Sequence, residues 1–502
     1  MKLAVRWSGV FLIIILAWGI GLRTHDLDKR SMWVDELFTL AIAQYHPLVP
    51  EAGKQLYRRI QVMQIKDGDS FLTAKAAEQS PPLNDLLEKA TVTWLGPTEL
   101  AARLPAAVFA CVLLVWFAGF AWRHPDPTIR RVLRWSLFLL ALHPTLILYA
   151  QEGRAYSAGV SLIGMGGLLW MLRWRAGWQH WRPPGWVEIV LFCLASYSHY
   201  NAALLVALLL LPDGVMTIRR RCLQGWIRLG ALGIVVFAWL LLNAHTILYT
   251  SEGRVGWGSA KPWDQMIWNA VQDAVATLHP YWLGIAVALL VLLIGAKNWK
   301  TRVNDYLSST TGLRLCVLAG LTLIYLVLAG KVAATAGMAH PRFFIFVVPF
   351  VTVMIAMLLA EIRQGWVIAS VAVLFAACAY PSVRLEESTN KDDFRAMTIA
   401  AVRGSDDDTL YLYALAPLRD VYRVSMHRYL GTDPIKRMTE IAVEQDAGQV
   451  CERLKGKDHV VALGHAWGQS LVDAVYTACG PQWPIRTVER FHQTFTEHWR
   501  VK

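Results

Sequence analysis

The chain has 502 residues, of which 55% are hydrophobic and only 17% are charged, against about 25% charged residues in an ordinary soluble domain. Together with a mean hydropathy of +0.36, this composition excludes a soluble globular enzyme and predicts a polytopic membrane protein whose apolar runs are helices. The formal net charge of +12 does not indicate a nucleic-acid partner, because most Arg and Lys residues stand in short clusters between apolar runs, where they set membrane orientation.

About eleven apolar runs approach the length that crosses a bilayer. They fall near 5–22, 100–121, 132–149, 155–172, 186–200, 202–218, 228–245, 280–296, 313–330, 342–360 and 366–381. The first run follows Lys2 and Arg6 and resembles a signal peptide. No small-residue cleavage pattern follows it, so we interpret it as a retained span.

Arg and Lys are concentrated in alternate connections between these runs, at 122–131, 173–184, 219–228, 297–313 and 361–365. The positive-inside rule then places the N-terminus in the cytoplasm and, after an odd number of spans, the tail outside it. We therefore predict a multi-pass plasma membrane protein, bacterial inner membrane in type. Residues 1–381 would form the membrane domain, with a first extracytoplasmic loop at 22–99, and residues 382–502 a soluble extracytoplasmic α/β domain.

The first loop is predicted to contain two short amphipathic helices suited to lie in the membrane interface. One covers 54–65. The other follows Pro81-Pro82 and carries an apolar stripe formed by Leu83, Leu86, Leu87, Ala90 and Trp94.

The tail alternates predicted helices (391–403, 417–430, 440–454 and 470–479) with predicted strands (409–415, 459–464, 485–491 and 494–501). Such alternation favours a mostly parallel sheet with an antiparallel edge. No glycine-rich nucleotide fingerprint is present, so we predict no nucleotide cofactor. The seven cysteines show no metal-ligand spacing. Cys451 and Cys479 would be free to form a disulfide in an extracytoplasmic tail, and two unpaired core residues explain them equally well.

An acidic pair, Asp35-Glu36, follows the first apolar run within SMWVDELFTLAIA (31–43). For the pair alone, the plainer explanation is a solvated site at a helix N-terminus, where the dipole favours carboxylates. Its position between a membrane span and an apolar helix-like run favours a catalytic role instead. A partly desolvated carboxylate has a raised pKa and is a better base.

Further polar residues interrupt apolar sequence on the same predicted side of the membrane. Arg103 lies at the outer end of the second span, where an interface anchor is the alternative explanation. The candidates in the other outer turns are Gln151, Glu152, Arg154, Tyr156, His199 and Arg342. A Glu152–Arg154 ion pair that stiffens a tight hairpin is the alternative for the 151–156 group. Arginines gathered on one side offer paired hydrogen bonds to a phosphate.

The chain resembles the GT-C glycosyltransferases of the protein O-mannosyltransferase and aminoarabinose transferase superfamily, in its bacterial branch. The resemblance is carried, in order, by WVDELFTLA (33–41), SPPLNDLL (80–87), AARLPAAVFA (101–110), LHPTLILYAQEGRAYS (142–157), SYSHYNAALL (196–205), HPRFFIFVVP (340–349) and KDDFRAMTIAAV (391–402).

The resemblance implies an enzyme that transfers a sugar from a polyprenyl-phosphate carrier at the extracytoplasmic face. The acidic residue that acts at the acceptor corresponds to Asp35, and the Gln-Glu-x-Arg-x-Tyr motif corresponds to residues 151–156. Many relatives have a histidine before the Pro-Pro pair, where this chain has Ser80, so no metal or acceptor role is carried over through that position.

We predict an inverting displacement with Asp35 as the base, while Glu36 orients the acceptor or, with Asp35, binds a divalent cation. Donor phosphate or sugar would be bound by Arg154, Arg342, Glu152, Gln151, Tyr156, His199 and Arg103. The acceptor would be a lipid, a glycan or a protein, and membrane lipids would surround the spans. The alternatives are a transporter or flippase, and a polymerase or ligase of lipid-linked saccharides. A flippase is expected to show midplane polar groups and internal repeats, and neither is evident.

Overall fold

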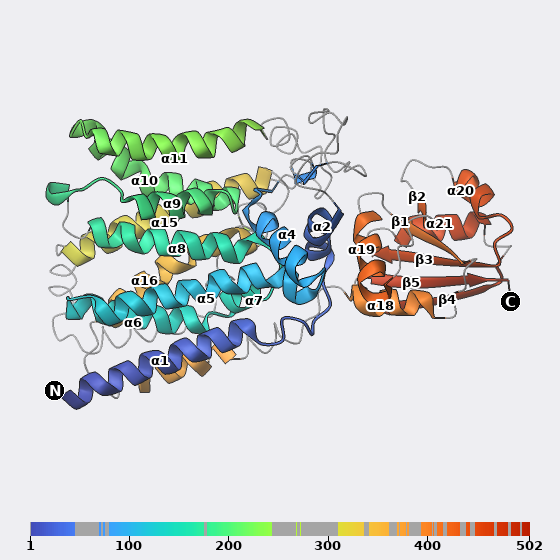
Figure 1. Ribbon diagram of the computed structural model, residues 1–502, viewed down its shortest axis with the longest axis horizontal. Helices are drawn as coiled ribbons and strands as arrows, with labels where there is room; N and C mark the ends of the chain where they lie inside the picture. The colour runs from blue at the N-terminus through green and yellow to red at the C-terminus, as the bar shows by residue number, and fades with distance from the viewer. Residues whose placement is uncertain are drawn as a thin grey trace. The chain divides into compact units, whose positions relative to one another are not determined.

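Figure 1 shows the computed structural model of the protein. The structure describes residues 2–45, 70–71, 74–75, 80–174, 178–242, 268, 272, 310–335, 341–360, 369–370, 372–377, 379–380, 393–403, 405, 409–414, 419–431, 438–441, 447–465, 469–479, 483–491 and 494–501.

The chain forms two compact units. The helical unit comprises Met1–His25, Glu78–Asn84 and Pro105–Glu387, and the mixed unit comprises Asp26–Ala77, Asp85–Leu104 and Ser388–Lys502. One unit boundary falls at Glu387, close to the predicted 382. Most of the first loop, however, belongs to the same unit as the tail rather than to the membrane helices.

The helical unit is built mainly from apolar helices that coincide with the predicted runs, and the short η2 lies in the predicted connection 173–184. The helices of the unit are α1 (Lys2–Thr24), α5 (Glu99–Arg123), α6 (Pro127–Leu142), α7 (Pro144–Ala150), α8 (Ala155–Arg173), η2 (Trp178–His180), α9 (Trp186–Ser196), α10 (Tyr200–Arg219), α11 (Leu223–Leu242), α15 (Thr310–Thr335), η3 (Pro341–Val347) and α16 (Val348–Leu359). The run at 280–296 lies outside the described residues, and the run at 366–381 is described only in part.

Within the described residues, four helices are long and apolar enough to cross a membrane, or five if the bent pair α6–α7 counts as one span. Shorter apolar helices cover Gly9–Thr24, Trp186–Ser196, Leu223–Ala238 and Cys316–Lys331. Large apolar side chains point outward, including Ile13, Ile218 and Ile234, which is 73% exposed. The chain is therefore a polytopic α-helical membrane protein, as predicted, with a C-terminal α/β domain.

The predicted run 132–149 is divided between two helices that meet at a bend. Pro144 has no backbone N–H and disfavours helical geometry at the preceding residue, so α6 ends at Leu142 and α7 continues at an angle of 60°. The buried guanidinium of Arg23 donates to the carbonyl oxygens of Leu140 (2.7 Å) and Ala141 (2.9 Å). These bonds add donors at the break, where Pro144 offers no N–H to the carbonyl of Leu140 and only the backbone N–H of His143 reaches it, at 3.5 Å.

Close packing of α8 brings the outer turns together. A Cβ atom on Gly159 would stand 2.8 Å from a ring carbon of Phe346, so only glycine admits η3 at this distance. Farther along α8, a Cβ on Gly167 would stand 2.5 Å from the ring of Phe350 in α16. The core of the unit is formed by buried side chains of α6, α8, α10, η3 and α16.

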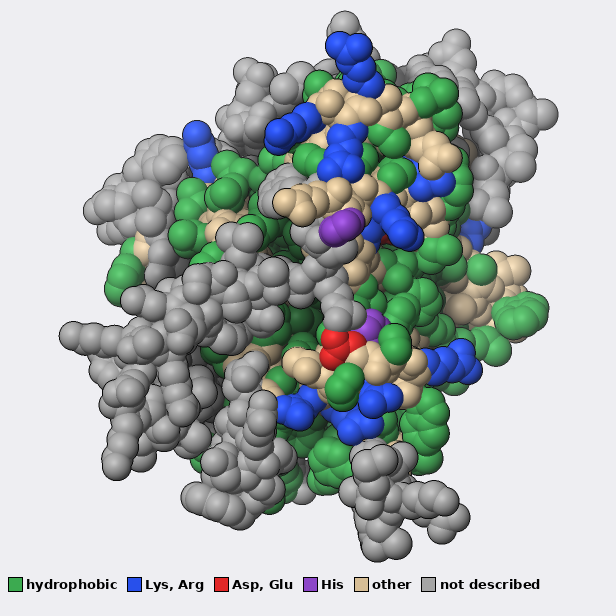
Figure 2. Space-filling view, turned by 90° about the vertical axis from the view of Figure 1, so that its left-hand side faces the viewer, with side chains coloured by type: hydrophobic (Ala, Val, Ile, Leu, Met, Phe, Trp, Pro, Cys, Tyr) green, Lys and Arg blue, Asp and Glu red, His purple; other side chains and the backbone are tan. Residues whose placement is uncertain are grey.

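Basic side chains gather at one end of the helical unit, with few acidic ones between them (Figure 2). The last turns of α5, α8 and α10 contain Arg123, Arg173 and Arg219 respectively, and Arg219, Arg220 and Arg221 are exposed. This concentration is typical of a cytoplasmic membrane face.

The mixed unit contains α2 (Val34–Tyr45), most of α4 (Leu83–Leu95) and the tail. The elements of the tail are α18 (Phe394–Val402), β1 (Leu410–Ala414), α19 (Arg419–Leu430), β2 (Met438–Ile441), α20 (Ala447–Leu454), β3 (His459–His465), α21 (Gln469–Cys479), β4 (Ile485–Phe491) and β5 (Thr494–Arg500). The sheet has the strand order β2-β1-β3-β5-β4. β1 is parallel to β2 and β3, and β5 is antiparallel to β3 and β4, which confirms the predicted sheet type.

The sequence interpretation missed β2, because 440–454 was predicted as one helix. The strand Met438–Ile441 pairs in parallel with β1, and the next described element is α20 (Ala447–Leu454). A four-residue strand is too short for its side-chain alternation to be recognised. Its pairing with β1 stabilises it instead.

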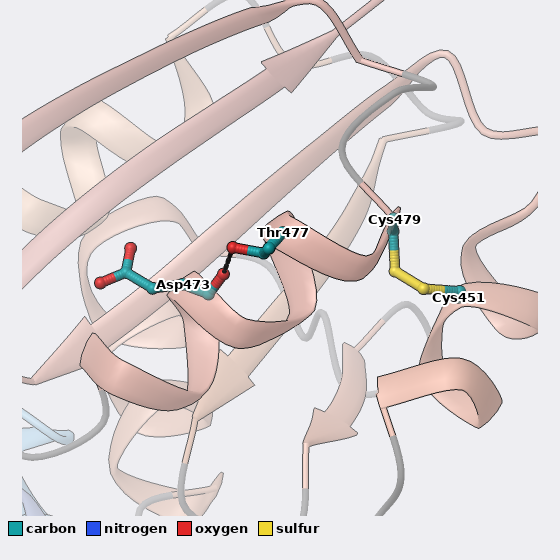
Figure 3. The surroundings of a disulfide bond; sticks show 4 residues. All are labelled: Cys451, Asp473, Thr477 and Cys479. Carbon is teal, nitrogen blue, oxygen red and sulfur yellow. Dashed lines mark hydrogen bonds between the residues drawn. A yellow bond between two sulfur atoms is a disulfide. The ribbon is translucent and has the colours of Figure 1, made fainter.

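Each face of the sheet has its own core, because side chains alternate along the strands. One face packs on α20 and α21. A disulfide between Cys451 of α20 and Cys479 of α21, with Cα atoms 5.3 Å apart, closes this side (Figure 3). The other face joins α18 and α19 to the first loop, since Met32, Leu37 and Leu40 belong to the same buried cluster as Tyr413 and Tyr422.

The stripe predicted on α4 faces outward. Trp94 is 89% exposed and Leu86 39% exposed, whereas Asp85 and Glu88 of the same helix are buried. Asp85 pairs with the buried Lys75 at 2.8 Å. An exposed apolar face over a charged inner face suits a helix at the membrane interface. The other predicted amphipathic stretch, 54–65, lies outside the described residues.

Candidate functional site

The acidic pair occupies the first turn of α2. Trp33 precedes the helix, and its backbone N–H donates to Oε2 of Glu36 at 3.3 Å, as in a capping box. Asp35 is half-buried and Glu36 is completely buried. Both carboxylates therefore lie at a helix N-terminus, which was the plainer explanation from the sequence. They differ in burial, since Glu36 is enclosed by protein and Asp35 is partly open to solvent.

Glu36 forms a buried salt bridge with Arg103 of α5. Nε of Arg103 donates to Oε1 and Nη2 donates to Oε2, each at 2.8 Å. The remaining guanidinium N–H groups donate to the carbonyl oxygens of Leu27 (2.9 Å), Arg30 (3.1 Å) and Ser31 (3.1 Å). All five N–H donors of Arg103 are thus used within the protein.

Arg103 and Glu36 both have partners within the protein, and their predicted roles at the donor and the acceptor stay predictions. Arg103 was expected to bind the donor phosphate, yet its donors already hold Glu36 and the 27–31 backbone. Glu36 was expected to orient the acceptor or bind a divalent cation, yet both of its oxygens already accept hydrogen bonds. We assign the pair to fixing the start of α2, which leaves Asp35 as the more exposed carboxylate. Among the described residues, no group of three or more His, Cys, Asp or Glu side chains is arranged to hold a metal ion.

The predicted donor motif forms a tight turn between α7 and α8. The backbone N–H of Arg154 donates to the carbonyl oxygen of Glu152 at 2.8 Å, and Arg154 then begins α8 as its N-cap. Gln151 and Glu152 are buried. Nε2 of Gln151 donates to the carbonyl oxygen of Leu22 at 2.7 Å, which ties the turn to the end of α1.

Aromatic rings from α8 and η3 lie against His199, which is in the turn between α9 and α10. The ring of His199 is 5.1 Å from that of Tyr156 and 5.0 Å from that of Phe346. The guanidinium of Arg342 lies over the rings of Tyr156 (5.7 Å) and Phe343 (5.6 Å). The structure therefore brings together side chains that are nearly 200 positions apart in the sequence.

The hydrogen bond that His199 accepts at Nδ1 indicates a neutral imidazole ring. The sequence interpretation expected His199 to bind the donor phosphate or sugar, and that role stays a prediction. Nδ1 of His199 accepts the backbone N–H of Asn201 at 3.1 Å, so the ring proton lies on Nε2, where it is a hydrogen-bond donor.

No protein-family model and no curated protein sequence matches the chain. Among solved structures, it is similar to ArnT from Cupriavidus metallidurans bound to undecaprenyl phosphate, with 12% identity and a TM-score of 0.57, over 99% of this chain and 98% of ArnT. The apo state of the same protein is similar at 11% identity and a TM-score of 0.58, with the same coverage. The chain has the GT-C fold.

The similarity agrees in fold with the resemblance stated from the sequence, and it extends over nearly the full length of both chains. Within this fold, Arg154, Tyr156, His199 and Arg342 gather in the helical unit. Asp35, Glu36 and Arg103 belong to the mixed unit.

Sequence reasoning missed Phe346 and Asn201, which contact the His199 ring and support it. Both lie within motifs that had been singled out, HPRFFIFVVP and SYSHYNAALL. The available signals were the amide side chain two residues after His199 and the run of aromatic residues in the HPRFFIFVVP motif.

Proposed function

We propose that the protein is a membrane glycosyltransferase that moves a sugar from a polyprenyl-phosphate donor to an acceptor hydroxyl. One observation carries the proposal: Arg342 and the half-buried His199 both contact the ring of Tyr156 in α8, the helix that Arg154 begins, within a fold shared with ArnT. The ArnT structure bound to undecaprenyl phosphate supports a donor of this class.

The donor phosphate binds in this cluster. Two guanidinium groups offer paired N–H donors to phosphate oxygens, and Nε2–H of His199 adds a neutral donor. Negative charge grows on the phosphate as it leaves the sugar, so these donors act most strongly in the transition state. Tyr156 supports the guanidinium of Arg342 through its ring face. Gln151 and Glu152 shape the turn that presents Arg154.

The transfer is a single displacement at the anomeric carbon, with inversion. The acceptor oxygen forms a bond to that carbon as the bond between the carbon and the phosphate oxygen breaks. The electron pair leaves with the polyprenyl phosphate, and the acceptor proton passes to the carboxylate of Asp35. Glu36 and Arg103 hold α2 so that Asp35 is presented to the acceptor.

The reaction takes place at the extracytoplasmic face, with the N-terminus in the cytoplasm. Basic side chains gathered at one end of the helical unit support this orientation (Figure 2). The disulfide in the tail supports it independently, because disulfides persist in oxidising compartments. By contrast, Cys111, Cys193 and Cys316 of the membrane helices are free thiols.

The test is a transfer assay with the full-length protein in liposomes. Labelled undecaprenyl-phosphate sugars, one carrying aminoarabinose and one a hexose, serve as donors with a membrane lipid extract as acceptor. A transferase consumes the monosaccharide donor and releases undecaprenyl phosphate, whereas a flippase only relocates the donor. A polymerase or ligase requires a lipid-linked oligosaccharide. Relocation without consumption of either donor would overturn the proposal.

Arg154→Ala adds a second arm. Because Arg154 is assigned to the leaving phosphate, its loss should lower kcat, and any change in KM should be larger for the donor than for the acceptor. Equal changes in the KM values for donor and acceptor would favour a structural Glu152–Arg154 pair instead.

A further inference from the structure

Five consecutive carbonyl oxygens before α2 are held by two arginines. In the 27–31 segment, Arg103 of α5 binds the carbonyls of Leu27, Arg30 and Ser31. Arg395 binds those between them, donating from Nη1 to Lys29 at 3.0 Å and from Nη2 to Asp28 at 3.2 Å. The segment ends three residues before α2 begins at Val34.

Arg395 comes from the tail domain, where it lies in the first turn of α18. Its backbone N–H donates to Oγ of Ser31 at 3.1 Å, which adds a contact to the same segment. Its Nη2 also donates to Oε1 of the buried Glu99 at 2.6 Å. Backbone and side chain of one tail residue therefore both bind the chain that leads to Asp35.

Glu99 connects this contact to the Arg103–Glu36 bridge. Glu99 and Arg103 are four residues apart on α5, so they occupy adjacent turns of one helix face. Glu99 also accepts two hydrogen bonds from Arg428 of α19, at 3.2 Å and 2.7 Å. The start of α5 is thereby fixed to the tail by Glu99 and to α2 by Arg103.

The apolar contacts alone already pack the tail against α2. Met32 and Leu37 lie in one buried cluster with Val421 and Tyr422 of α19. The carbonyl contacts of Arg395 add nothing to that cluster. They restrict the backbone conformation of the 27–31 segment instead, because the planar guanidinium can reach two successive carbonyl oxygens only in a narrow range of backbone geometries.

We propose that Arg395 is a positioning residue for the candidate base, so that the tail domain completes the support of the 27–31 segment and sets where α2 presents Asp35. The inference rests on the proposed function for its catalytic readout. It gives the tail a role in the chemical step through Asp35, whether or not the tail also contacts the acceptor.

Arg428 supplies a matched control. Both arginines are on the tail, both pair with Glu99, and their side chains are 34% (Arg395) and 31% (Arg428) exposed. Of their hydrogen bonds described above, only those of Arg395 reach the 27–31 carbonyls. Arg395→Ala and Arg428→Ala thus remove the same charge from Glu99 and differ in the backbone contacts.

The experiment compares Arg395→Ala, Arg395→Lys and Arg428→Ala with wild type in the full-length protein. We expect Arg395→Ala to lower kcat about tenfold to a hundredfold with little change in KM for the donor, because a misplaced base costs rate rather than donor binding. Arg428→Ala should retain at least a third of wild-type kcat. Arg395→Lys should recover kcat only partly, because an ammonium lacks the planar fork.

Hydrogen exchange supplies a readout that does not depend on turnover. Amides of residues 32–40 should exchange faster in Arg395→Ala, while those of β1, β3 and α19 keep their wild-type rates. Equal losses of kcat in Arg395→Ala and Arg428→Ala, or faster exchange throughout the tail, would overturn the inference and leave a role in stability alone. If wild type itself transfers no sugar, the proposed function fails, and exchange at 32–40 still decides whether Arg395 fixes α2.

Discussion

Replacing Arg103 by alanine should release the start of α2. The substitution leaves Glu36 fully buried without its cation, and it also removes the partner of three backbone carbonyls. Breaking a buried ion pair from one side costs about 3–5 kcal/mol. At 1.4 kcal/mol for each factor of ten, local protection of α2 amides should fall between roughly a hundredfold and a few thousandfold.

The assay is hydrogen exchange of the full-length protein in detergent, followed at the amides of residues 34–40. The matched control is Arg123→Ala, which removes an exposed arginine from the last turn of the same helix and should leave α2 unchanged. The double variant Glu36→Gln with Arg103→Leu should recover much of the protection, since the unpaired charge is the main cost. Protection of α2 within threefold of wild type in Arg103→Ala would refute the assignment of this bridge to α2.

Three further outcomes are expected. Gly159→Val should raise KM for the donor, because a larger side chain displaces Phe346 from the His199 ring, and an unchanged KM would contradict that contact. Reducing the Cys451–Cys479 disulfide should destabilise the tail by roughly 3–4 kcal/mol, from a sequence separation of 28, and exchange of α20 and α21 amides with and without reductant measures this. Burial, with Arg500 and Arg403, lowers the pKa of His498, so below about pH 6.5 the unfolded tail binds a proton that the folded tail does not. Stability of the tail should therefore fall as pH drops from 7 towards 5, and His498→Gln should flatten that dependence in thermal melts.

Membrane helices could be predicted from the sequence because hydrocarbon requires long apolar runs with internally paired backbones. The same signal concealed the break at His143. Pro144 stands inside an uninterrupted apolar run, so hydropathy merged α6 and α7 into one span. The buried Arg23 that binds the broken end lies about 120 residues away in the sequence, beyond any local pattern.

The role of the acidic pair could be predicted only in part. The local sequence showed that Asp35 and Glu36 begin a helix, but it gave no means of telling which of the two carboxylates is buried. The buried bridge that separates their roles joins residues 67 apart, and no periodicity reports such a pairing. Arg395 was overlooked for the same reason, because its partners in the 27–31 segment lie more than 360 residues before it.

The sequence pattern of an amphipathic helix also did not show which of its faces is buried. The stripe on α4 was recognised from its spacing, yet spacing alone does not say whether the apolar face turns inward or outward. In the mixed unit, the buried Lys75–Asp85 pair occupies the inner side, which leaves Leu86 and Trp94 exposed.

The most direct test of the central claim is sugar transfer by Asp35→Asn in liposomes. Asparagine keeps the shape of the side chain and removes the base, so wild-type exchange rates at 34–40 and normal membrane insertion should accompany a loss of transfer. Proton abstraction by a positioned base contributes about 10²- to 10⁴-fold, and a fall in kcat of that order is the predicted result. Wild-type turnover by Asp35→Asn would contradict the account.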